Sequence, residues 1–177
     1  MKTLGIIIAL AVMIFVAYIY NVLLNSRNNA RKEYVKLDML LGNRWNLIPE
    51  LTKIIQSYSV VEEKNIEKLS SLINQDFSQF QMEKKLEVDN NIEKVFSKIM
   101  KIAKESPDLQ ENEQFIHLSN QLSNLKVEIA DCKKNYDKAV KEYNEQIEVV
   151  PNNLVAILFG FNEEKIYDVT SKGKKNI

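Results

Sequence analysis

The N-terminal part of the chain carries an apolar run long enough to cross a membrane as a helix. Residues 4–24 read LGIIIALAVMIFVAYIYNVLL, and the polar side chain of Asn21 alone interrupts the run. At about 1.5 Å per residue, a helix of this length reaches roughly the 30 Å of a bilayer's hydrocarbon core. The sequence therefore predicts a transmembrane anchor over residues 1–26 that contacts the lipid bilayer through residues 4–24.

The alternative reading of this run is a cleaved signal peptide. Such a peptide has a shorter apolar core that is followed by small residues at the cleavage site. Here the small residues Ala9 and Ala11 lie inside the run, and the sequence Tyr-Asn-Val-Leu-Leu ends it. An uncleaved anchor is therefore favoured.

Charges on either side of the anchor indicate its orientation. Lys2 precedes it, whereas Arg27, Arg31, Lys32 and Lys36 follow it. The excess of basic residues after the anchor predicts a cell-membrane protein whose soluble domain lies in the cytoplasm. The single cysteine, Cys132, cannot form an intramolecular disulfide, which agrees with a reducing compartment.

After the anchor, three amphipathic stretches precede residue 106. The first continues directly from the anchor to about residue 63 and contains Pro49, which predicts a local kink. The second covers residues 66–77, and the third covers residues 88–103 and ends at Ser106-Pro107, because the residue before proline avoids the helical region. The apolar positions of the first stretch are Leu37, Leu41, Ile48, Leu51, Ile55 and Tyr58, with a second line at Leu40, Leu47, Ile54 and Val61.

A fourth helix has the clearest pattern. Asp108 with Glu111 three residues later forms a variant of the capping box and predicts the helix start. Apolar residues then alternate by three and four, which is typical of a coiled coil, until Pro151 stops the helix. These residues are Phe115, Leu118, Leu122, Leu125, Ile129, Cys132, Tyr136, Ala139 or Val140, Tyr143, Ile147 and Val150.

Together these stretches predict an all-α fold. The transmembrane helix continues into an antiparallel four-helix bundle of two long and two short helices, over residues 27–161. The short pair can cover only the membrane-distal half of the long pair, so the membrane-proximal half is expected to bind a protein partner or a second copy of the chain. Residues 154–161 are too few to span a bilayer, and they either pack on the proximal bundle or contact lipid. Residues 162–177 are expected to be a disordered polar tail.

Composition agrees with this architecture. The chain contains 4 glycines and 3 prolines in 177 residues, and such a shortage of turn-forming residues favours helices. The 24 basic and 24 acidic side chains cancel, so nothing directs the domain towards nucleic acid. The isolated glycines form no phosphate-binding loop.

The sequence offers no convincing catalytic, cofactor-binding or metal-binding residues. His117 has no Glu-x-x-His partner and lies one position off the apolar stripe, so it is interpreted as a surface or boundary histidine. Cys132 falls on the stripe and is interpreted as a small apolar core residue. The pairs Glu62-Glu63 and Glu163-Glu164 are interpreted as solvated, and the aromatic residues Tyr34, Trp45, Tyr58, Tyr136 and Tyr143 as core.

Several short motifs occur in an order that points to a known family. They are Tyr20-Asn21-x-Leu23 with Arg27-Asn28, Asn46-Leu47-Ile48-Pro49 with Tyr58, Ser106-Pro107-Asp108-Leu109 with Glu111-Asn112 and Phe115, Tyr136, Val140 and Tyr143-Asn144, and Pro151, Asn153, Ala156 and Phe159-Gly160-Phe161. In this order and spacing, over residues 20–161, the chain resembles the LemA family of bacterial membrane proteins.

The resemblance implies a single-pass membrane protein with a helical bundle and no agreed enzymatic activity. The chain departs from the family pattern at Tyr136-Asp137, where the family usually has Tyr-Asn, and at Val61-Glu62, where it has His-Glu. We expect a non-catalytic interaction or scaffolding module. The alternatives are a sensor that relays a signal through the continuous first helix, and an accessory to a membrane enzyme.

Overall fold

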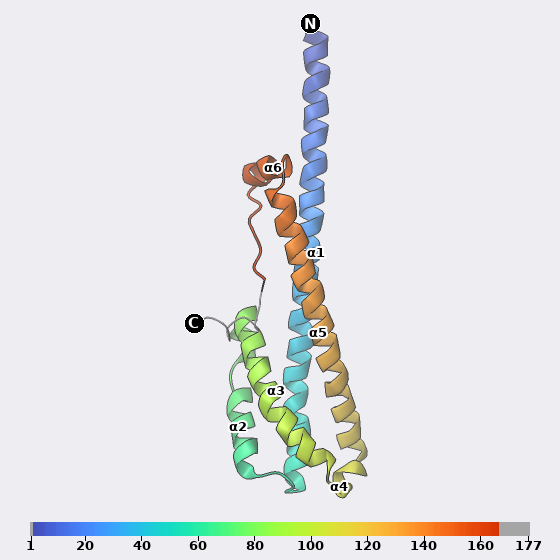
Figure 1. The fold of residues 1–177 in the computed structure, drawn as a ribbon, viewed down its shortest axis with the longest axis vertical. Coiled ribbons are helices and arrows are strands. Elements are labelled where there is room, and N and C mark those ends of the chain that lie inside the picture. Colours follow the sequence, from blue (N-terminus) through green and yellow to red (C-terminus); the bar gives the residue numbers. More distant parts are fainter. Residues whose placement is uncertain (1, 167–177) are drawn as a thin grey trace, which may run out of the picture. The chain divides into compact units, whose positions relative to one another are not determined.

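The computed structural model describes residues 2–166, and this part of the chain is helical without any strand (Figure 1). The residues form two compact units: unit 1 contains residues up to 36 together with 132–166, and unit 2 contains residues 37–131. The helices are α1 (Lys2–Ser57), α2 (Glu63–Ile73), the 3-10 helix η1 (Phe77–Gln79), α3 (Met82–Lys104), α4 (Pro107–Gln110), α5 (Glu113–Glu148) and α6 (Asn152–Phe159).

Helix α1 runs without a break from the apolar N-terminal run into the following domain, as predicted. It continues through Pro49 and ends at Ser57, not at residue 63. The reason is a turn at Tyr58 and Ser59, in which Ser59 adopts a positive φ of 53°. Val60 and Val61 then pack on the core from a loop.

The apolar run of α1 is almost uncovered. Within residues 2–166, α1 is the one helix long and apolar enough to cross a membrane, and only 11% of its most apolar 18-residue stretch is buried. A core helix of a soluble protein would be mostly buried. The uncovered surface is therefore compatible with a membrane anchor.

The core of unit 2 is built from five helices. Buried apolar side chains come from α1, α2, α3, α4 and α5, and Phe77 on η1 stacks on Trp45 with ring centroids 4.4 Å apart. The second amphipathic stretch is thus divided between α2 and η1. An antiparallel four-helix bundle stays a prediction. The largest fully buried side chains of the unit are Leu37, Leu41, Ile48, Leu51, Ile55, Leu69, Met82, Ile92, Ile99 and Leu109.

The predicted start of the fourth helix was wrong. Pro107 occupies the first turn of the short helix α4, which places Asp108 inside that helix. Helix α5 begins at Glu113, five residues after Asp108. Asn112 caps this helix, because the Asn112 Oδ1 accepts a hydrogen bond of 2.8 Å from the Phe115 backbone N–H. Proline therefore created a separate turn where the capping pattern alone predicted one continuous helix.

The apolar stripe of α5 is buried nearly as predicted. Its members in both units are buried except for Leu125, which is half-buried. Val150 was also assigned to the stripe, and this was wrong: α5 ends at Glu148, and the side chain of Val150 is 71% exposed.

In unit 1, helix α6 packs against α1 and α5 with one face. Val155 and Ala156 are buried, and they share a cluster with Ile19, Leu23 and Phe161, among others. Gly160 ends the helix in the left-handed conformation with a φ of 71°. The chain can therefore reverse and place Phe161 in the same cluster.

The residues after Phe161 run back along α5. The Tyr143 hydroxyl donates a hydrogen bond of 2.9 Å to the Asn162 carbonyl, and the Tyr136 hydroxyl donates one of 2.8 Å to the Lys165 carbonyl. The Asn144 side chain donates to the carbonyl of Glu164 and accepts from its N–H. Residues 162–165 are thus bound to α5, and the predicted tail beyond residue 166 lies outside the described residues.

Candidate functional site

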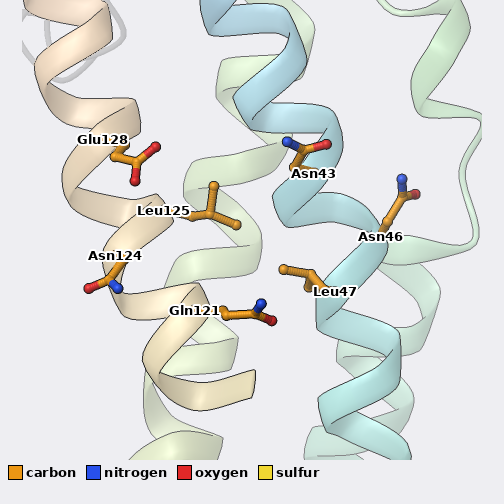
Figure 2. Close-up of a pocket in the computed structure, with 7 residues that line it drawn as sticks. All are labelled: Asn43, Asn46, Leu47, Gln121, Asn124, Leu125 and Glu128. Atoms are coloured by element: carbon orange, nitrogen blue, oxygen red, sulfur yellow. The ribbon is translucent and has the colours of Figure 1, made fainter. Parts of the chain in front are cut away.

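A groove lies between α1 and α5 in unit 2 (Figure 2). It has a volume of about 420 Å³. Figure 2 shows Leu47 and Leu125 pointing towards each other across it, with polar side chains along both helices. The lining residues are Asn43, Asn46 and Leu47 from α1, and Gln121, Asn124, Leu125 and Glu128 from α5.

The groove arises because the apolar stripes of α1 and α5 extend beyond the buried core. Leu47 belongs to the second line of α1, and Leu125 belongs to the stripe of α5. Both are half-buried, whereas their stripe neighbours Ile48 and Leu122 are buried in the core. The exposed amides of Asn43, Asn46 and Asn124 flank the leucines. Such a surface can bind an apolar side chain and exchange hydrogen bonds with its neighbours.

An ion-pair network around the buried Arg44 joins α1 to α3 and α5 within unit 2. The Arg44 side chain is 4% exposed, and its Nη1 donates hydrogen bonds of 3.0 and 2.9 Å to the two carboxylate oxygens of Asp89. Its Nη2 pairs with Glu93, whose other oxygen lies 2.6 Å from the Lys126 ammonium. Burial raises the pKa of the Asp89 carboxyl, Arg44 opposes this shift, and Glu93 adds to it. The sequence pattern did not reveal this network.

Cys132 lies buried in unit 1, as predicted for a stripe residue. Its Sγ is 3.7 Å from the backbone carbonyl of Glu33 and 3.9 Å from the carboxylate of the same residue. Burial raises the pKa of the thiol, the negative charge of Glu33 raises it further, and Lys36 acts in the opposite direction. The thiol is therefore poorly suited to act as a nucleophile.

Cys132 is expected to react with iodoacetamide far more slowly than a free cysteine at pH 8. The raised pKa reduces the thiolate fraction, and the side chain is only 1% exposed. Mass spectrometry of alkylation against time would measure the rate. The chain in denaturant provides the reference, and equal rates with and without denaturant would contradict the expectation.

The other candidate residues do not line the groove. His117 is exposed on α5, and Glu62, Glu63, Glu163 and Glu164 are exposed, as interpreted from the sequence. Among the aromatic residues, Tyr136 and Tyr143 are buried, and Tyr34 and Trp45 are half-buried. The assignment of Tyr58 to the core was wrong: α1 ends just before it, and its exposed hydroxyl accepts a hydrogen bond of 2.9 Å from the Asn112 amide. Within residues 2–166, no group of three or more His, Cys, Asp or Glu side chains is arranged to hold a metal ion.

Comparison with known proteins gives a family but no curated relative. A search of curated proteins finds no match to this chain. The sequence model described as the LemA family matches residues 33–177, which include all of unit 2, α5, α6 and the residues bound to α5. This match covers well over half of the sequence, and the chain therefore belongs to the LemA family.

Proposed function

We propose that this protein is a non-catalytic interaction module, anchored in the cell membrane by α1, whose unit 2 groove binds a helix of a protein partner in the cytoplasm. The observation that carries this proposal is the groove of Figure 2, in which Leu47 and Leu125 remain half-buried between flanking amides. Partly exposed apolar side chains rimmed by polar ones can form the apolar centre and polar rim of a protein-binding surface.

The shape of the groove favours a helical occupant. The lining residues progress in opposite directions along α1 and α5, so these helices run antiparallel on either side of it. An amphipathic helix can pack an apolar side chain between two such helices, in the way that ridges on one helix pack into the grooves of another. The amides would pair with its polar flanks, and Glu128 favours a basic residue near its own end of the groove.

Anchoring is supported by the uncovered apolar run and by the basic residues after it. The membrane-proximal stripe was expected to bind the partner. Tyr136, Val140 and Tyr143 on this stripe are buried within unit 1 itself. We therefore place the partner in the unit 2 groove.

Site-specific photocrosslinking in native membranes tests the groove. Benzophenone side chains are introduced at Asn46 or Asn124, which are exposed groove residues, and at Ser123 as an exposed position of α5 outside the groove. We expect one protein to crosslink at Asn46 and at Asn124 but not at Ser123. An additional Asn124→Arg change should remove most of the Asn46 crosslink, because it places a long charged side chain in the groove. A Ser123→Arg change should leave the crosslink intact.

Other outcomes have defined meanings. A crosslink only between copies of this chain would make the groove a self-association surface of a scaffold. Equal crosslinking at all three positions, or none, would contradict the groove as a binding site. Trp45 fluorescence, which reports the stacked pair with Phe77 in unit 2, checks that each variant folds.

A sensor function is the alternative, and the continuity of α1 favours it. The same helix carries the apolar run and the groove residues Asn43, Asn46 and Leu47. A change in the membrane could therefore alter the groove through one element. This function would be preferred if Pro49→Ala abolished a cellular response while the groove crosslink stayed unchanged.

A further inference from the structure

Helix α6 has one buried and one exposed apolar face, and residues 152–161 contain no charged side chain. Val155 and Ala156 are 5% and 3% exposed, because they pack in the unit 1 cluster. On the other face, Leu154, Ile157 and Leu158 are 64%, 80% and 73% exposed. Three large aliphatic side chains on an eight-residue helix form a surface that water does not favour.

Aromatic contacts fix the level of α6 along α1. The Tyr20 ring lies 5.0 Å from the Phe159 ring and 5.6 Å from the Phe161 ring, measured between centroids. Tyr20 precedes the end of the apolar run at Leu24 by about 6 Å of helix. If the run crosses a bilayer, these contacts lie at the boundary between hydrocarbon and headgroups, where tyrosine is favoured.

Basic side chains follow at the level expected for headgroups. The Arg27 guanidinium lies over the Phe161 ring at 4.9 Å from the centroid. Arg27 is about 10 Å farther along the helix than Tyr20. Arg31 and Lys32 come one turn later and are exposed. Unit 1 therefore has an apolar level at α6 and a basic level beyond it, which is the order of layers in a leaflet with anionic lipids.

We propose that α6 is an interfacial helix that inserts Leu154, Ile157 and Leu158 into the same leaflet from which α1 emerges. Lipid is the occupant that fits this face, because the exposed side chains of Phe15 and Tyr18 on α1 are already surrounded by lipid at neighbouring depth when α1 is anchored. An interfacial helix buries its apolar face about 5–10 Å into the headgroup and acyl boundary. The inference rests on the anchoring of α1 and is independent of the groove.

Depth-dependent fluorescence quenching of the full chain in vesicles tests this inference. Trp45, the only tryptophan, is replaced by phenylalanine, and single tryptophans are placed at Leu158, at Phe15 or at Lys141, which are all exposed in unit 1. These sites report α6, the apolar run of α1 and the C-terminal part of α5, respectively. The vesicles contain phosphatidylcholine with bromine either high on the acyl chains or near their ends.

We expect the Leu158→Trp chain to emit at shorter wavelength than the Lys141→Trp chain and to lose most of its fluorescence with bromine high on the acyl chains. The Phe15→Trp chain should also be quenched, and the Lys141→Trp chain should not. Quenching at Phe15 without quenching at Leu158 would overturn the α6 inference alone. A blue-shifted but unquenched Leu158→Trp chain would mean that protein covers α6, which overturns it equally. Absence of quenching at Phe15 would overturn the anchoring and this inference together, while the groove could still be tested by crosslinking.

Discussion

Replacing Arg44 by methionine is expected to destabilise unit 2 by about 3–5 kcal/mol, although the side-chain volume hardly changes. The substitution leaves the carboxylates of Asp89 and Glu93 facing each other with side-chain exposures of 14% and 26%. Lys126 still pairs with Glu93, but Asp89 loses both of its hydrogen bonds from Arg44. Urea unfolding of the full chain in detergent, followed by Trp45 fluorescence, would measure the change.

The pH dependence of this loss has a defined sign. Burial already raises the pKa of Asp89 above its ordinary value, and removal of Arg44 would raise it further. A carboxyl group whose pKa is raised by folding destabilises the fold once it ionises, and the penalty disappears when the pH falls below its unfolded pKa. The difference between the Arg44→Met variant and the parent should therefore be largest at neutral pH and shrink in acid.

A matched variant separates the lost charge from lost packing. Replacing Arg44, Asp89 and Glu93 together by methionine, leucine and methionine removes the uncompensated charges, and apolar substitutes for a buried ion pair are often neutral or stabilising. We expect this triple variant to be more stable than Arg44→Met alone. If it were equally unstable, the network would act through shape and not through charge pairing.

Replacing Phe161 by alanine is expected to cost unit 1 about 3 kcal/mol, because the side chain is 6% exposed and contacts the ring of Tyr20 and the guanidinium of Arg27. Without this anchor, α6 and residues 162–165 should detach from α5. Hydrogen exchange of the backbone amides in residues 152–165, measured by mass spectrometry, should accelerate strongly.

The effect of Phe161→Ala should be confined to unit 1. Trp45 fluorescence and the urea midpoint of unit 2 should hardly change in the Phe161→Ala variant, because Phe161 packs in the unit 1 cluster. Phe159→Ala is the matched control: this side chain is 50% exposed and should cost much less. Equal acceleration in both variants would show that Phe161 is not the main anchor of α6.

Periodicity predicted most of the fold because burial along a helix repeats every three to four residues. The stripe of α5 and the continuity of α1 follow from this repeat alone. Helix ends were harder, since they depend on competition between local signals. Asp108 with Glu111 has the better capping pattern in sequence, but Pro107 starts its own turn and Asn112 caps α5.

The groove and the charge network were not predictable in this way. Residues 43–47 and 121–128 lie far apart in sequence, and nothing in either segment indicates that Leu47 and Leu125 face each other. Arg44 has the same limitation, because its partner Asp89 is 45 positions away. Polar residues between apolar stripe positions were the available signal: Asn43, Arg44 and Asn46 interrupt the apolar positions Leu41, Leu47 and Ile48 of α1.

The division of the chain into units sets an order for folding during synthesis. Unit 2 is contiguous over residues 37–131, so all of its described parts have been made when Asp131 leaves the ribosome. Unit 1 joins the start of the chain to its last described residues, since Ile19 and Leu23 share a cluster with Phe161. Contacts between such distant segments close late. The stretch of α1 that leaves the apolar run therefore stays without its partners until the whole of unit 2 has been translated.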